Sequence, residues 1–232
     1  FTIYKNYFNN ENMKTEDFKN TKPIIKIEEY FQGEIEAWGI LQDRKGKVTR
    51  SFKANMSGKF ENNILTLEED FYWKDGEEQK RIWKIKKIDE HNYIGTAPDV
   101  VGEAKGFSYG SAFKFEYDLL IPIKGKNIKI RFDDWIFKQD EEEQKRIWKI
   151  EKIDEHNYSG TAPDVVGIAK GVSYGNAFKF EYNLMVPFKG KSIKIRFDDW
   201  IFKQDDKVAI NRATLSKFGF KVGELTVFFK KN

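Results

Sequence analysis

The stretch "AFKFEYDLL" at Ala112–Leu120 decides the fold class. Apolar and charged residues alternate along it, and one face of an extended chain would carry Phe113, Phe115, Tyr117 and Leu119. A period of two residues is typical of a β-strand with one buried face. Aromatic side chains also pack well on a pleated surface. The stretch therefore predicts a half-buried strand.

This strand occurs twice, because the chain contains a tandem copy of its middle part. Glu77–Asp140 aligns with Glu142–Asp205 at a constant offset of 65 residues, and the copies differ at only a handful of positions. "RFDDWIFKQD" stands at Arg131–Asp140 and again at Arg196–Asp205. The second aromatic row consists of Phe178, Phe180, Tyr182 and Leu184. Such close similarity indicates a recent tandem duplication, an assembly artefact or an engineered insertion.

Each copy contains about four predicted strands, and the even number decides what the duplication does to the sheet. Gly125 and Gly190 supply the tight turns of two hairpins. Four inserted antiparallel strands return the chain to the edge that it left. We therefore predict an all-β fold, an antiparallel lipocalin-like barrel or strongly curved meander sheet enlarged by about four strands. Two alternatives stay open: one copy is extruded, or the copies pair between chains in a swapped dimer.

The flanks fit the same architecture. Residues 1–20, rich in Asn and Lys, predict a flexible N-terminal arm, and residues 21–232 predict a single β-barrel-like domain that contains copies 77–140 and 142–205. "KPIIKIEEYF" near residues 22–31 is the one stretch with helical character. The beginning of the chain lacks the pattern of a signal peptide, and no apolar run approaches the ~18 residues of a membrane helix.

Composition excludes several classes of function. The 232 residues are 40% hydrophobic and 16% aromatic, with a net charge of +4 spread over mixed charges. Nucleic-acid binding needs a concentrated basic face, so we predict no nucleic-acid partner. Cysteine is absent, which excludes disulfides and cysteine–metal sites. There is no phosphate-binding loop and no metal-ligand spacing, so the sequence predicts no cofactor and no metal.

The sequence "FDDW" is the most suggestive for chemistry. Phe132 lies on the same, inward-facing side of the predicted strand as Ile130, whereas Trp135 falls on the other side. This break in the alternation predicts a bulge at Asp133–Asp134. One interpretation is a carboxylate pair that works with His91 in acid–base catalysis. The other is structural: one Asp caps the bent backbone and the other faces water. The equivalent residues in the second copy are Asp198, Asp199 and His156. Both histidines lie in "DEHNY", a composition typical of exposed turns.

Two further groups of residues have predicted roles. Trp38 in an early strand and Arg212 in a late strand predict a stacked pair that closes one end of a barrel. The predicted ligand-binding residues are the aromatic rows and two tryptophans: Phe113, Phe115, Tyr117, Phe178, Phe180, Tyr182, Trp135 and Trp200.

Five blocks resemble one family. They are "EYFQGEIEAWGILQDRKGKVTRSF", "LEEDFYWKDGEEQKRIWKI", "YIGTAPDVVGEAKG", "RFDDWIFKQD" and "INRATLSKFGFKVGELTVFFKK". In this order they resemble the bacterial lipoproteins called domain of unknown function 3833, with the middle blocks doubled. The resemblance covers residues 15–232. It implies a lipocalin-like barrel, a periplasmic or outer-membrane-associated location, and no established activity. It implies membrane association only if a lipidated leader precedes this chain.

These observations favour a non-catalytic protein that binds an apolar or lipid-like ligand inside a β-barrel. Two alternatives are kept. The first is a structural envelope protein with a filled interior. The second is an enzyme that acts on lipids through Asp133, Asp134 and His91 or their second-copy equivalents.

Overall fold

The computed structural model describes residues 13–139 and 147–231, apart from positions 124 and 189. These residues confirm the predicted all-β, antiparallel class. Two short helical turns accompany the strands, the 3-10 helix η2 (Thr15–Phe18) and the helix α1 (Ile27–Tyr30). Neither of these described helices has the length and apolarity of a membrane span. The chain divides into two compact units, one on each side of residues 140–146.

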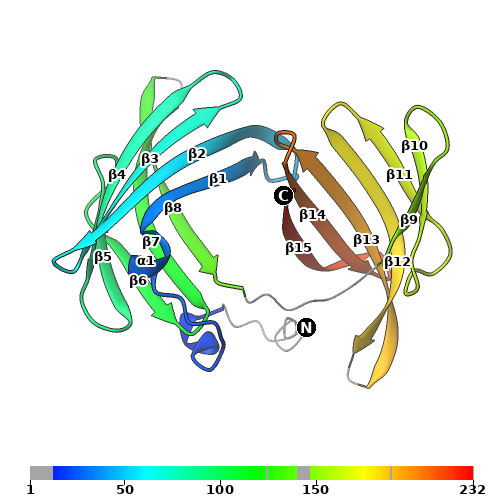
Figure 1. Cartoon of the computed structure of the whole chain (residues 1–232), viewed down its shortest axis with the longest axis horizontal. Coiled ribbons are helices and arrows are strands. Elements are labelled where there is room, and N and C mark those ends of the chain that lie inside the picture. Colours follow the sequence, from blue (N-terminus) through cyan, green and yellow to red (C-terminus); the bar gives the residue numbers. More distant parts are fainter. Residues whose placement is uncertain (1–12, 124, 140–146, 189, 232) are drawn as a thin grey trace. The chain divides into compact units, whose positions relative to one another are not determined.

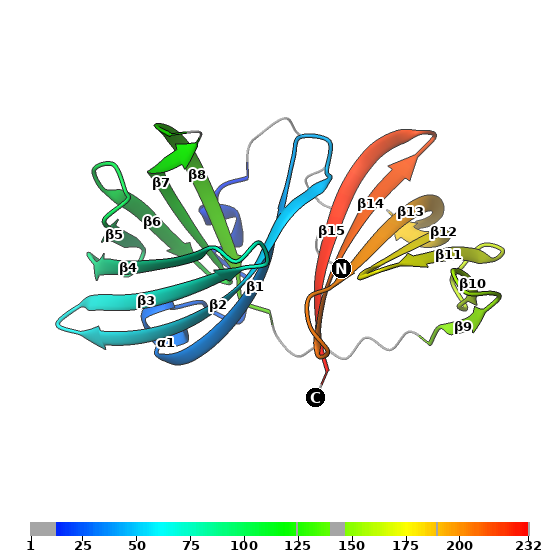
Figure 2. The same cartoon turned by 90° about the horizontal axis from the view of Figure 1, so that it is seen from above.

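The N-terminal unit is an eight-stranded sheet in which every strand pairs with its neighbour in sequence. Its curvature is visible in Figures 1 and 2, where its strands run from blue to green. The strands are β1 (Gly33–Gln42), β2 (Val48–Glu61), β3 (Ile64–Trp73), β4 (Glu78–Lys87), β5 (Asn92–Thr96), β6 (Ala104–Tyr109), β7 (Ala112–Ile123) and β8 (Lys126–Phe137). β1 and β8 are the edges of this curled half-barrel.

The C-terminal unit is a seven-stranded sheet of the same meander type. Figure 1 shows it in yellow to red. The strands are β9 (Lys149–Lys152), β10 (Asn157–Thr161), β11 (Ala169–Tyr174), β12 (Ala177–Phe188), β13 (Lys191–Lys203), β14 (Val208–Lys217) and β15 (Phe220–Lys230). Its edges are β9 and β15.

The prediction that both copies extend one continuous sheet is wrong for the described strands. Each copy contributes five strands, an odd number, where about four were predicted. The first copy contributes β4–β8 and stays with β1–β3, whereas the second contributes β9–β13 and continues into β14 and β15. Each copy thus pairs with the strands that adjoin it along the chain. Strongly twisted open sheets rarely exceed about ten strands before they split. The junction between the copies, residues 140–146, lies outside the described residues.

The predicted bulge at Asp133–Asp134 is also wrong. β8 pairs with β7 without a break from Ile123↔Lys126 to Ala112↔Phe137. β13 pairs without a register shift on both sides of Asp198–Asp199. The break in the alternation therefore does not reflect a bulge. It arises because this regular strand carries aromatic residues on both of its faces.

Residues 21–31 form a segment that closes the N-terminal unit, which we call the plug segment. The Ile25 N–H donates to the Gly110 carbonyl at 2.8 Å, and the Ser108 hydroxyl donates to the Ile25 carbonyl at 3.0 Å. Ile25 and Ile27 are each only 1% exposed. Glu28 accepts hydrogen bonds from Lys87 and Tyr93. The helical character predicted for residues 22–31 is realised in the single turn of α1.

The predicted N-terminal arm is described only from residue 13 onward. Thr15–Phe18 form η2, and the Phe18 ring lies 6.2 Å from the ring of Trp135 and 5.4 Å from that of Phe137. Residues 1–12 of the predicted arm lie outside the described residues.

Candidate functional site

The aromatic row of the N-terminal unit lies in its core. Phe113, Phe115 and Tyr117 are 2–6% exposed and share one cluster with Ile25 and Ile27 of the plug segment. Phe113 and Phe115 lie over Gly106 and Gly95, where a Cβ atom would come within 2.9 Å and 2.5 Å of the rings. The row therefore packs against the plug segment and the sheet and belongs to the buried core of this unit.

The second row lies on a sheet that no plug segment precedes within the described residues. Phe180 and Tyr182 are buried, but Phe178 is only half-buried. Residues directly opposite each other on paired strands point to the same face. By this register Leu225 and Phe229 of β15 lie on the face of the row, and they are 39% and 47% exposed. The apolar face around Phe178 is therefore more exposed than the equivalent face around Phe113 in the N-terminal unit.

The two aspartates of "FDDW" point to opposite faces of β8, because consecutive residues of a regular strand alternate. Asp133 lies 3.2 Å from the ammonium of Lys114, and its side chain is 53% exposed. Asp134 accepts a hydrogen bond of 2.5 Å from the Tyr117 hydroxyl in the interior. They are not a catalytic carboxylate pair in this geometry. The same alternation holds in the second copy, where Tyr182 donates to Asp199 at 2.7 Å and Lys179 lies 3.4 Å from Asp198.

Asp134 instead belongs to a cluster of charged groups inside the N-terminal unit. The Arg81 guanidinium donates to the carboxylate of Asp99 at 2.8–3.2 Å and lies 3.8 Å from Glu69. The side chains of Arg81 and Glu69 are only 14% and 13% exposed. The pKa values of two acids respond to this environment. Burial raises the pKa of Glu69 to about 7, although Arg81 opposes the shift. Burial also raises the pKa of Asp134, against the hydrogen bond from Tyr117 and the charge of Arg81.

The sequence contained a signal for Glu69 and Arg81 that our prediction passed over. Glu69 stands in the inward phase of "LTLEEDFYW", between Leu67 and Phe71, and Arg81 pairs with it from β4. A charged residue in an apolar phase predicts a buried ion pair. Asp99 lies in the connection between β5 and β6, and nothing local marked it.

The chemistry open to this cluster is proton exchange near neutral pH, because burial raises the pKa of Glu69 to about 7. Within the described part of the chain, no group of three or more His, Asp or Glu side chains is arranged to hold a metal ion. Glu69 has no counterpart in the second copy, because β3 is not duplicated. The counterpart of Arg81 lies outside the described residues.

The histidines lie apart from these acids. His91 Nδ1–H donates a hydrogen bond of 2.9 Å to the Ser108 carbonyl, and its ring stacks on Tyr109 at 4.1 Å. β6 and β7 separate its turn from β8 in the sheet. His156 repeats both contacts, with Ser173 at 3.0 Å and Tyr174 at 4.1 Å. The structure therefore does not bring His91 together with Asp133 and Asp134.

Trp135 and Trp200 lie on the face opposite to the aromatic rows, because they are out of phase with Asp134 and Asp199. Trp135 stacks on Phe137 and has the ammonium of Lys114 at 5.3 Å. Trp200 is 41% exposed and stacks on Phe202. Both tryptophans were predicted to bind ligand together with the aromatic rows. They lie on the other face of the sheet, so they cannot contact the same ligand as the rows.

Trp38 and Arg212 lie in different units. The Lys53 ammonium lies 5.5 Å from the Trp38 ring, and Arg212 forms an ion pair with Glu224. An arginine–tryptophan stack of the predicted kind is formed by other residues, with the guanidinium carbon of Arg50 3.9 Å above the ring of Trp73.

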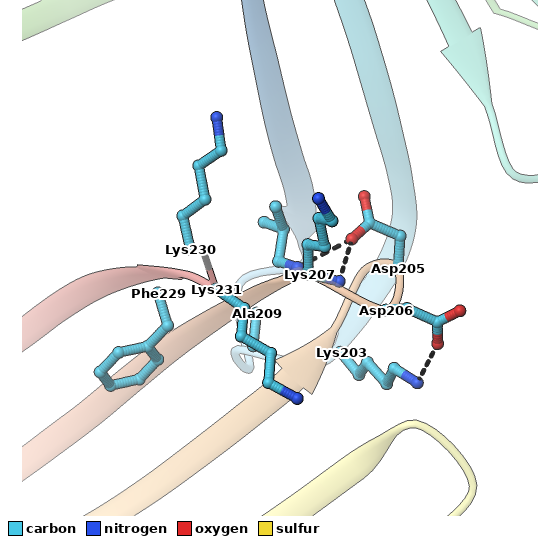
Figure 3. Close-up of a pocket in the computed structure, with 9 residues that line it drawn as sticks. Lys203, Asp205, Asp206, Lys207, Ala209, Phe229, Lys230 and Lys231 are labelled. Carbon is cyan, nitrogen blue, oxygen red and sulfur yellow. Dashed lines mark hydrogen bonds and ion pairs between the residues drawn. The ribbon is translucent and has the colours of Figure 1, made fainter.

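A shallow depression of about 330 Å³ lies beside the turn between β13 and β14. Figure 3 shows the side chains that line it, which include Ala209, Phe229 and four lysines. Those lysines are Lys203, Lys207, Lys230 and Lys231. The Asp205 carboxylate accepts the backbone N–H groups of Lys207 and Val208 at 2.7 Å and 2.8 Å, which fixes the turn. By the register, Ala209 and Phe229 continue the open apolar face of the C-terminal unit.

Comparison with known proteins gives one family. The family described as "Protein of unknown function (DUF3833)" matches the chain twice, over residues 7–143 and over residues 137–231. The two matches correspond to the two units of the structure. No curated protein and no solved structure matches the chain. Together the matches span nearly the whole sequence, and the chain belongs to the DUF3833 family, whose function is unknown.

Proposed function

We propose that this protein is a non-catalytic binding protein of the bacterial cell envelope that holds an apolar or amphipathic, lipid-like ligand. The ligand lies against the open aromatic face of the C-terminal unit. The observation that carries the proposal is the difference between two nearly identical rows. Phe113 is 2% exposed under the plug segment, whereas its equivalent Phe178 is half-buried. An apolar face that stays partly exposed among the described residues is a typical ligand surface.

The lysine-rich depression gives the proposed ligand an orientation. An apolar tail would follow the face of Phe178, Phe180 and Leu225. An anionic head group would lie near Lys203, which the register places on the same face as Ala209 and Phe229. The envelope location, a lipidated leader and a lipocalin-like relationship rest on the family resemblance and are part of the proposal.

Native mass spectrometry tests the proposal on protein purified without detergent. We expect a bound species with the mass of a lipid. Phe229→Ser should reduce its occupancy, because Phe229 lies on the open face. Phe228→Ser is the matched control, because Phe228 is 65% exposed on the opposite face of the same strand. Ligand-free protein from native membranes, or equal losses in both variants, would contradict the proposal.

The N-terminal unit favours a second, structural role. Its interior is filled by the plug segment and the core residues, with Ile25 and Ile27 almost fully buried. In this arrangement the first unit is a support and the second carries the binding surface. We do not propose the lipid-acting enzyme, because Asp133, Asp134 and His91 do not converge.

A further inference from the structure

The plug segment docks on residues that the duplication has copied. In the first copy it contacts Ser108, Gly110 and Ser111 at the β6–β7 hairpin. It also contacts Lys87 and Tyr93 on β4 and β5. The equivalent residues of the second copy are Ser173, Gly175, Asn176, Lys152 and Tyr158. Four of these five equivalents are identical, and the exception, Asn176, is again a small polar residue.

The surface of the second copy is open where that of the first is covered. A Cβ atom added to Gly110 would lie 1.8 Å from the carbonyl oxygen of Phe18, whereas at Gly175 it would meet nothing within 4 Å. Tyr93 is 3% exposed, but Tyr158 is half-buried. Tyr174 is 63% exposed. The two sites therefore have nearly the same sequence and differ in occupancy.

The contacts of the plug segment define what the open surface recognises. Two backbone groups of Ile25 are bound, its N–H by a carbonyl and its carbonyl by a serine hydroxyl. The Glu28 carboxylate takes the ammonium of Lys87 at 2.5 Å and the hydroxyl of Tyr93 at 2.9 Å. Backbone recognition indicates a polypeptide, and the paired ammonium and hydroxyl indicate an acidic side chain.

We propose that the second copy is a peptide-docking surface for a segment with the chemistry of residues 21–31. Such a segment has two aliphatic side chains separated by one residue, followed by a carboxylate. Gly175 and Ser173 bind its backbone, and Lys152 and Tyr158 bind its acid. This surface is separate from the lysine-rich depression at the β13–β14 turn, but it includes Phe178, the equivalent of the Phe113 that the plug segment covers. A docked peptide would therefore compete with the proposed lipid-like ligand for Phe178.

The test uses the full chain and a fluorescently labelled synthetic peptide of residues 13–31, with binding followed by anisotropy. We expect saturable binding at one site per chain. Tyr158→Phe and Lys152→Ala should each weaken it about tenfold, which corresponds to about 1.4 kcal/mol. A peptide carrying Glu28→Gln should lose a similar factor on the unaltered protein, and this readout does not depend on the folding of any variant.

The duplication supplies the matched controls. Tyr93→Phe and Lys87→Ala make the same chemical changes in the occupied site, where the tethered plug segment has a high effective concentration. These variants should bind the labelled peptide as the unaltered protein does. If the protein forms a dimer that the peptide dissociates, the proposal is supported, and the occupant of the open surface is the plug segment of a second copy of the chain. Absence of saturable binding, or equal effects of Tyr158→Phe and Tyr93→Phe, would overturn it.

Discussion

At the scale of single residues, the phase of a strand decides which side chains can work together. Asp133 and Asp134 are neighbours in sequence, yet one contacts Lys114 on one face and the other contacts Tyr117 in the interior. Glu69 and Arg81 are distant in sequence, but the register places them opposite each other. Alternation predicted the aromatic rows correctly. The acid cluster depends on pairing between strands, which local patterns do not specify.

The two aromatic rows give a stability prediction with an internal control. Phe113→Ala removes a ring that is 2% exposed and should lower the free energy of unfolding by about 3–5 kcal/mol. Phe178→Ala, at the half-buried equivalent, should cost roughly half as much. Urea denaturation of both variants measures the difference. Equal losses would mean that the second row is covered as fully as the first.

Glu69 predicts a pH dependence of stability. Its pKa is raised from 4.5 to about 7 by folding, so the folded state binds more protons between these two pH values. The free energy of unfolding should therefore fall as pH rises from 4.5 to 7, by up to about 3 kcal/mol.

Replacement of Glu69 isolates this contribution. Glu69→Gln should flatten the slope and stabilise the N-terminal unit at pH 8, as measured by urea denaturation at pH 5 and pH 8. Glu68→Gln is the control, because Glu68 is 51% exposed on the other face. An unchanged slope in Glu69→Gln would assign the dependence to another group.

At the scale of elements, the structure differs from the prediction at the edges of the sheets. Alternation and turn residues predicted the strands themselves, including the hairpin of β7 and β8. The sequence could not predict which strand ends a sheet, because β8 and β13 share the sequence "RFDDWIF". β13 lies between β12 and β14, whereas β8 has a described partner on one side only. Identical residues therefore occupy an edge and a centre.

Hydrogen exchange followed by mass spectrometry should distinguish these two strands. An edge strand leaves alternate N–H groups without a partner in its sheet, so about half of the β8 amides should exchange early while those of β13 stay protected. Intrinsic exchange rates are matched because the sequences match. Asn127 and Ser192 give the two peptides different masses. Equal protection would show that another strand covers β8.

At the scale of the whole molecule, each unit carries a different part of one shorter sequence. The N-terminal unit has β1–β3 without β14 and β15, and the C-terminal unit has the reverse. The sequence predicted the duplication, but it predicted about four strands in each copy where the structure has five. It could not predict the separation into two sheets, because that depends on how many twisted strands one sheet accommodates.

A deletion tests whether one copy is dispensable. Removal of residues 141–205 joins Asp140 to Asp206 and reproduces the natural sequence "KQDDKVAIN" across the junction. We expect β8 to pair with β14 in a single unit that unfolds in one transition, whereas the full chain unfolds in two. Thermal unfolding by circular dichroism measures this. An insoluble or unfolded product would show that both copies are needed.

β8 has no described partner strand on its outer side, so the β14–β15 hairpin has two equivalent strands that it could join, β8 and β13. Pairing of β14 with β13 closes a turn of about four residues, whereas pairing with β8 would close a loop of about 70 residues. Closing the longer loop costs about 2–3 kcal/mol more in chain entropy. Proximity along the chain, rather than complementarity, therefore selects β13. Because this penalty grows only with the logarithm of length, the spacing between the repeats could drift widely in evolution without changing the choice. Residues added to the short turn after Lys203 would raise its closure cost much more per residue, and so would reduce the preference for β13 over β8.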